Sequence, residues 1–248
     1  MDLNITQIVV VAVVVYLGFF GKGVTGMGGP LLTIPVLAGF TGLEFAVAVI
    51  GIPTIVANSV MLWDSRGASK GVMRFFWPLL ITGTIATVIG AWILVSVDER
   101  LMTIVLAAFL ILYVLWSVAN KDFQLSDEWA RRLSAPAGLA AGLLQGGTGA
   151  SGPVIATFVH SLNLTREAFV FAVCIPFQVL GMTQIISLAA FGAYDRERLI
   201  VGAIATIPAL LALRPAMKLG ERLSHGTFRM LILIFLLITA IRLIWTVV

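Results

Sequence analysis

The sequence has little charge and almost no cysteine. Of its 248 residues only 11% are Asp, Glu, Lys or Arg, whereas 60% are hydrophobic, and the mean hydropathy is +1.06. A soluble domain of this length could not cover so much apolar surface, so we predict an all-α polytopic membrane protein. The single cysteine, Cys174, excludes a disulfide framework.

Motifs of ATP hydrolysis and of familiar catalytic chemistries are also absent. The sequence has no Walker motif, no metal-ligand spacing, no G-x-S-x-G and no HExxH. A membrane-embedded enzyme would need a nucleophile and a base, and only Cys174 and His160 are available. We therefore expect no enzymatic activity, no cofactor, no metal and no nucleic-acid partner. The net charge of +4 fits an anionic partner and basic cytoplasmic loops about equally well.

The chain contains an internal repeat, in which residues 21–53 match residues 144–176. The two segments share 10 identities over 33 positions, where chance in this composition gives roughly 3. Both contain the pattern G-x-T-G-x-x-G-P, which interrupts a hydrophobic stretch. In membrane transporters, Gly/Pro interruptions at corresponding places in two halves point to the substrate site.

The apolar segments form two sets of five. Spanning a bilayer takes about 20 residues, and the first two segments of each set are shorter than that. They form either one broken span or a hairpin of two short helices that enters the membrane and returns to the same side. The first set covers about 5–20, 29–40, 43–63, 73–97 and 101–119, and the second covers about 135–146, 152–163, 167–192, 198–218 and 226–247.

The basic residues favour the hairpins. With hairpins, 11 cations fall on one face and 3 on the other, with Lys22 and Arg242 set aside, whereas broken spans divide them nearly evenly. The positive-inside rule assigns the larger group to the cytoplasm, so both termini are predicted outside and the two repeats inverted. The larger group is Arg66, Lys70, Arg74, Lys121, Arg131, Arg132, Arg166, Arg214, Lys218, Arg222 and Arg229, and the smaller is Arg100, Arg196 and Arg198.

This topology divides the chain into three parts. Residues 1–119 form the first transmembrane repeat, residues 120–133 a cytoplasmic linker, and residues 134–248 the second transmembrane repeat. Each repeat is predicted to be a short-helix hairpin followed by three transmembrane helices. The linker is the only polar stretch of any length, and we expect it to be amphipathic around Trp129.

The repeated motifs predict an anion site where two hairpin tips meet near mid-membrane. Helices that begin after Gly28 and after Ser151 would aim their free N–H groups and positive dipole ends at that point. Glycines admit a ligand to the backbone, and three hydroxyls could add donors. Alternatively, the glycines only allow close helix packing. The predicted tip residues are Gly23, Thr25, Gly26, Gly28, Gly29, Gly146, Thr148, Gly149, Ser151 and Gly152.

Lys22 and Gln145 occupy corresponding positions at the two predicted tips. A lysine inside a membrane is costly and is a functional hypothesis by default. Lys22 could bind the anion or carry a proton that couples to it, or its side chain could simply reach the outer interface.

Asn58 and Gln178 follow prolines on the third helix of each repeat, five residues after Pro53 and two after Pro176. A proline frees a carbonyl and can kink a helix toward a cavity. Both amides are therefore candidates for the substrate site, with ordinary interhelical hydrogen bonding as the alternative.

Glu44 and Glu167 match one another at the start of the same third helices. Glu44 follows Thr41 by three residues, which is the spacing of an N-capping pair. We favour capping over proton coupling for both carboxylates.

At the glycine motifs, the chain resembles the sulfite exporter TauE/SafE family, also called the toluene sulfonate uptake permeases. The resemblance covers essentially the whole length, with two halves that each open on a Gly-rich motif and a proline. Residues 26–35 (GMGGPLLTIP) carry it in the first half, and residues 149–153 carry a more degenerate form in the second. The resemblance implies transport of small sulfur-containing or organic anions such as sulfite, sulfonates and sulfoacetate.

We therefore expect a secondary transporter of a small anion that works by alternating access. It would be a multi-pass protein of the cell membrane, specifically a bacterial inner membrane, surrounded by the lipid bilayer. An anion channel with the same site and a carboxylate transporter are the alternatives. The sequence leaves open which anion is moved, in which direction, whether a proton is coupled, and whether two copies form a homodimer.

Overall fold

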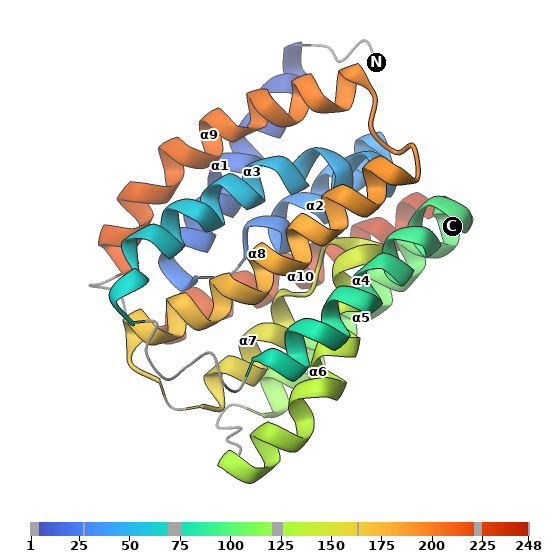
Figure 1. Cartoon of the computed structure of the whole chain (residues 1–248). Coiled ribbons are helices and arrows are strands. Elements are labelled where there is room, and N and C mark those ends of the chain that lie inside the picture. The colour runs from blue at the N-terminus through green and yellow to red at the C-terminus, as the bar shows by residue number, and fades with distance from the viewer. Residues whose placement is uncertain are drawn as a thin grey trace.

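The computed structural model describes residues 5–26, 28–68, 76–120, 126–162, 164–220 and 225–247. Within these ranges every regular element is helical, which confirms the predicted all-α class (Figure 1). Four predicted cytoplasmic cations, Lys70, Arg74, Lys121 and Arg222, lie outside the described residues. The elements are α1 (Ile5–Thr25), α2 (Gly29–Thr41), α3 (Leu43–Asp64), the 3-10 turn η1 (Arg66–Ala68), α4 (Trp77–Ser96), α5 (Glu99–Ala119), α6 (Asp127–Thr148), α7 (Gly152–His160), α8 (Arg166–Ala190), α9 (Arg196–Gly220) and α10 (His225–Val247).

Five helices in the described part of the chain are long and apolar enough to cross a membrane, namely α3, α4, α5, α8 and α9. Their outer faces are apolar too. Leu112, Ile186 and Leu211 each expose more than 60% of their surface, at 65%, 62% and 65%. Contiguous apolar exposure of this kind suits lipid rather than water, so length and surface agree on a polytopic membrane protein.

The first glycine motif joins two antiparallel helices. Gly18 of α1 lies against Thr33 and Gly29 of α2, while Val11 and Leu37, further along the two helices, line one small cavity. In the second half, α6 and α7 also pack on each other across a short turn. Only one arm of each hairpin is short, however. Helices α1 and α6 have 21 and 22 residues, against 13 in α2 and 9 in α7.

The long arm of the second hairpin begins inside the predicted linker. The first turns of α6 are amphipathic, with Ala130 buried, Trp129 55% exposed, and Arg132 paired with Glu128 at 2.6 Å. These first turns are too polar to be recognised as part of an apolar segment. The hydropathy pattern therefore placed the start of the helix at about residue 135, whereas α6 begins at Asp127.

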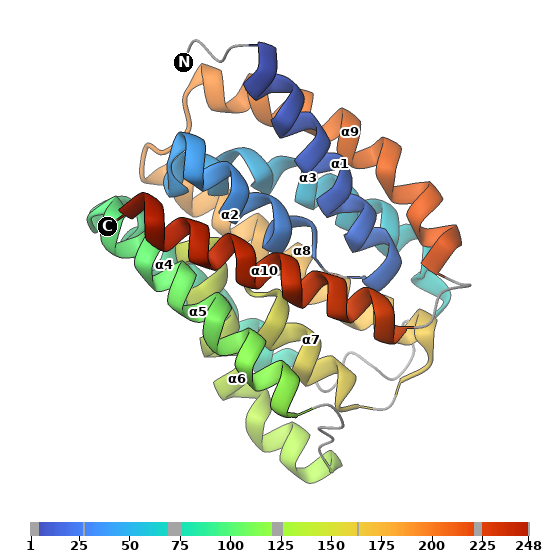
Figure 2. The same cartoon turned by 180° about the vertical axis from the view of Figure 1, so that it is seen from behind.

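The helices of the two halves are interleaved. α1 packs along α9, and α6 packs along α4; Figure 2 shows α1 beside α9. A Cβ at Gly23 would lie 2.7 Å from the carbonyl oxygen of Leu213, and one at Gly146 would overlap the backbone of Thr87. These contacts require glycine. The packing alternative therefore accounts for Gly23 and Gly146.

Both views place the beginning of α1 and the end of α10 toward the same end of the helix bundle (Figures 1 and 2). We predict that this end faces outside, because the predicted cytoplasmic face carries most of the cations. In a Cys174→Ala background, cysteines at Gly67 and Ser126 should stay unlabelled by an impermeant maleimide in intact cells, whereas a cysteine at Arg196 should react. Labelling of the first two in intact cells would contradict this topology.

Candidate functional site

The two repeated motifs form similar turns with different backbone requirements. Gly26 and Gly149, which correspond in the repeat, both have positive φ, at 81° and 66°, where the preceding helix ends. Gly28 also has positive φ, at 116°, whereas its counterpart Ser151 has φ −72°. Only glycine enters the left-handed region without strain. The second motif can therefore carry serine at a position where the first needs glycine.

The turns of the two hairpins meet around one aromatic side chain, Phe177 of α8. The Lys22 Nζ lies over the Phe177 ring, 4.9 Å from its centroid. A Cβ at Gly152 would lie 3.6 Å from Phe177 Cζ and 4.0 Å from Leu31 Cδ2. A side chain at Gly149 would overlap Ile34 of α2. The segments that the sequence predicted to converge thus lie together, and Phe177 is a residue that the sequence did not single out.

Lys22 is fully buried, at 0% exposure, and its Nζ has no hydrogen-bond acceptor within reach. The methylene chain of Lys22 packs beside Gly29, where an added Cβ would lie 3.1 Å from Lys22 Cδ. This fixes the side chain inside the protein and excludes the alternative in which it reaches the interface. An ammonium has three donors to satisfy, and an aromatic face satisfies none of them by a full hydrogen bond.

Asn58 and Gln178 also hold buried atoms without partners. Within the described part of the chain, the buried side-chain atoms that lack a hydrogen bond are Lys22 Nζ, Asn58 Nδ2 and Oδ1, and Gln178 Oε1. Gln178 Nε2 donates to Ser59 Oγ at 3.2 Å and so links α8 to α3. Buried polar groups are nearly always hydrogen-bonded. All four exceptions fall on three residues that the sequence predicted for the site.

The three predicted hydroxyl donors are already engaged within the protein. Thr25 Oγ1 donates to the Gly21 carbonyl at 2.8 Å, and Thr148 Oγ1 donates to the Leu144 carbonyl at 2.8 Å. Ser151 Oγ donates to Gln145 Oε1. Each hydroxyl would have to give up such a bond to donate to an anion. The unpartnered donors Lys22 Nζ and Asn58 Nδ2 are therefore better placed to bind one, whereas the unpartnered atom of Gln178 is an acceptor.

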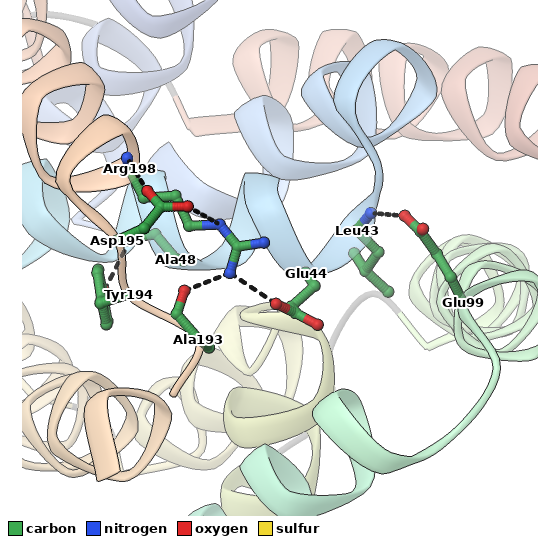
Figure 3. A network of polar contacts seen from close by, with 8 residues as sticks. All are labelled: Leu43, Glu44, Ala48, Glu99, Ala193, Tyr194, Asp195 and Arg198. Carbon is green, nitrogen blue, oxygen red and sulfur yellow. Dashed lines mark hydrogen bonds and ion pairs between the residues drawn. The ribbon is translucent and has the colours of Figure 1, made fainter. Parts of the chain in front are cut away.

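A charged network lies away from the tips, where α3, α5 and α9 begin (Figure 3). Arg198 Nη1 donates to Glu44 Oε1 at 2.6 Å and to the Ala193 carbonyl. Leu43 N, in the first turn of α3, donates to Glu99 Oε1 at 2.7 Å. The capping prediction for Glu44 is therefore wrong. Glu44 pairs with a cation 154 positions away, and a glutamate from another helix caps α3.

At α8 the capping side chain is again not the predicted glutamate. Thr165 Oγ1 accepts from Ala168 N at 3.4 Å, and Glu167 lies exposed in the first turn. A negative charge there still favours the helix start through its dipole. The capping group itself is the hydroxyl one residue before the helix.

Tyr194 joins the same network as Arg198 from the loop between α8 and α9. Its hydroxyl donates to the Ala48 carbonyl at 2.8 Å. Burial raises the pKa of the Tyr194 phenol to about 12, and the nearby Arg198 charge opposes that rise. The phenol therefore stays a donor at any physiological pH and ties this loop to α3.

The fold and the site together define a class of protein. A polytopic helical membrane protein whose two glycine-rich hairpins meet at a buried lysine has the architecture of a membrane transporter. Among the described residues, no group of three or more potential metal ligands occurs. The chain belongs to the sulfite exporter TauE/SafE family, whose model matches residues 10–243. This is a family of membrane transporters of sulfur anions, and the match confirms the resemblance seen in the glycine motifs. No curated protein matched the chain, and no solved structure matched it.

Replacing Asn58 by leucine should stabilise the protein and weaken anion binding. The amide is buried without partners, so its removal relieves a desolvation cost of about 1–3 kcal/mol. We expect a higher unfolding temperature in detergent without ligand, and a smaller further rise when sulfite or a sulfonate is added. Thr54→Val is the matched control, because Thr54 Oγ1 is buried and bonds the Ile50 carbonyl at 2.7 Å. A lower unfolding temperature for Asn58→Leu than for Thr54→Val would contradict this role.

Proposed function

We propose that the protein is a secondary transporter of a small anion, namely sulfite, a sulfonate or a related organosulfur anion. The observation that carries this proposal is the buried Lys22 ammonium, which lies between the two hairpin turns with no acceptor of its own. An anion would supply the missing acceptor. Membership of a family of sulfur-anion transporters supports the same substrate class.

The chemistry of the site suits an oxyanion. Lys22 would provide charge, and the first turns of α2 and α7 would provide backbone N–H groups and positive dipole ends. Pro30 and Pro153, the second residues of these helices, need donate no hydrogen bond there. The Asn58 amide adds a neutral donor, whereas Gln178 Nε2 already donates to Ser59 Oγ and serves to link α8 to α3. Tetrahedral or pyramidal oxyanions accept several bonds at once, which a single lysine could not satisfy.

Alternating access is the mechanism we infer. In the repeat, α1 corresponds to α6 and α4 corresponds to α9, and the observed packing of α1 on α9 and of α6 on α4 is the same pairing with the halves exchanged. This supports two equivalent halves related by a two-fold axis, and the odd number of segments predicted in each half would invert one half relative to the other. Rocking one hairpin against the other would expose the shared site to each side in turn.

An anion channel and a carboxylate transporter remain the competing functions. A channel would pass current through an uninterrupted path, whereas a carrier would exchange labelled substrate and saturate. Flux into proteoliposomes, measured over sulfite, sulfonates, thiosulfate and carboxylates, separates all three. Saturable flux of the sulfur anions without channel-like conductance supports the proposal. A location in a bacterial inner membrane belongs to the same proposal.

Lys22→Gln should weaken anion binding by roughly 10- to 100-fold, because a hydrogen bond to a charged group contributes about 1.5–3 kcal/mol. The fold should tolerate this change, since glutamine already stands at the matching position 145. Any pH dependence of transport should flatten. Lys22→Arg should keep more of the affinity but lose proton exchange, since arginine stays charged. Wild-type affinity and pH dependence in Lys22→Gln would contradict a role of Lys22 in binding and leave the anion to the helix starts and the Asn58 amide.

Gly29→Val and Gly152→Val should abolish transport. At Gly29 even a Cβ would lie 3.1 Å from Lys22 Cδ and 3.3 Å from Phe19 Cε1, and the branched carbons would add bulk where the anion approaches the backbone. At Gly152 a Cβ fits, and the further carbons of valine would crowd Phe177. Thr148→Ala should only weaken transport. Near-normal proteoliposome flux in both valine variants, at equal reconstituted amounts, would refute the tip site.

A further inference from the structure

Each hairpin turn brings the end of one helix beside the start of the next. The start of a helix favours an anion, but the end carries free carbonyls and about half an elementary negative charge. An anion held at the turns therefore meets α1 and α6 at their unfavourable ends. In the first hairpin, Lys22 lies in the last turn of α1 and offsets this charge. In the second hairpin, the corresponding residue is the neutral Gln145.

A second glutamine, Gln184 of α8, covers the end of α6. It is 2% exposed, and its Nε2 donates to the carbonyl oxygens of Gln145 and of Gly146, the latter at 3.3 Å. Its Oε1 accepts from Gln145 Nε2 at 2.8 Å. Gln145 Oε1 in turn accepts from Ser151 Oγ, immediately before α7. This chain of amides connects the end of α6 to the start of α7.

The Gly146 carbonyl would otherwise lack a partner in its own helix. The N–H that normally reaches it is four residues later, on Ala150. Ala150 N instead donates to Thr148 Oγ1 at 3.3 Å. Because the turn leaves the helix here, the carbonyl needs a donor from outside its own helix, and Gln184 supplies that donor.

We propose that Gln184 is a positioning residue of the anion site, which masks the carbonyl end of α6 and so does at the second turn what Lys22 does at the first. This rests on the proposed transport of an anion. With the carbonyls covered, the positive end of α7 dominates the field at the second turn. An amide achieves this without a second buried ammonium, whose desolvation would be costly.

The proposal predicts that anion affinity follows the charge at position 184. Gln184→Leu removes the masking donor and should weaken binding about tenfold, the effect of one hydrogen bond in a charged site. Gln184→Glu replaces donors by negative charge and should weaken binding more than leucine does. Adding Gln145→Lys to Gln184→Leu makes the second turn resemble the first and should restore most of the affinity. Thr183→Ala is the control, because its hydroxyl donates to the Val179 carbonyl of its own helix at 2.9 Å.

Dissociation constants for sulfite and a sulfonate, together with unfolding temperatures of the same purified variants, distinguish this role from a purely structural one. A structural role predicts that affinity follows unfolding temperature, whatever the charge at position 184. Wild-type affinity in Gln184→Leu, or no gain from Gln145→Lys, would overturn the proposal.

Hydrogen exchange separates the failure of this inference from the failure of the proposed function. Gln184→Leu should speed amide exchange at residues 146–152 and leave residues 22–29 unchanged, with no anion present. If the wild-type protein binds none of the anions, the transport proposal fails. In that case, unchanged exchange in Gln184→Leu would overturn the role of Gln184 as well. Faster exchange would show that Gln184 still stabilises the second turn.

Discussion

The contact between the Lys22 ammonium and the face of Phe177 is the interaction on which the site depends. Placing a charged side chain in a membrane interior has a large desolvation cost. The attraction between a cation and an aromatic ring offsets about 2 kcal/mol of that cost when both groups are desolvated. The fold holds the lysine in place through packing. Gly23 brings α1 close against α9, and Gly29 leaves room for the methylene chain. The position is therefore enforced by packing, and Nζ is left without a hydrogen-bond acceptor.

In the proposed anion site, the two hairpins would meet the same electrostatic requirement with different chemistry. Both would have to offset the carbonyl end of a helix beside the anion. One uses a single cation in the last turn of α1, and the other uses a pair of amides from α6 and α8. A site with one ammonium binds less tightly than one with two. Weaker binding would suit the proposed transport, because a transporter has to release its substrate.

Much of the candidate site could be predicted from the sequence, because its residues belong to short sequence motifs. Glycines, prolines and a lysine inside apolar stretches are visible without a structure, and the repeat pairs them. Phe177 and Gln184 carry no such signal. An aromatic residue in an apolar helix resembles any core residue, and the bonds of Gln184 reach across 39 and 38 positions. The capping interpretation of Glu44 failed for the same reason, since its partner is 154 residues away.

The network around Arg198 shows how the site is connected to one end of the molecule. Glu44 and Asn58 lie on the same helix, α3. If α3 moves as a rigid helix, the ion pair at its start and the unpartnered Asn58 amide move together. Tyr194 and Gln178 impose the same coupling on α8 and its loop. The Arg198–Glu44 pair is partly exposed, at 20% and 33%, and such pairs contribute about 1 kcal/mol or less. Parting α3 from α9 at this end therefore costs little electrostatic energy, but Gly202 of α9 packs closely on Val49 and Ile52 of α3, as Gly23 of α1 does on α9. Because close glycine contacts hold α9 against both α1 and α3, helix packing rather than the ion pair resists any opening at this end.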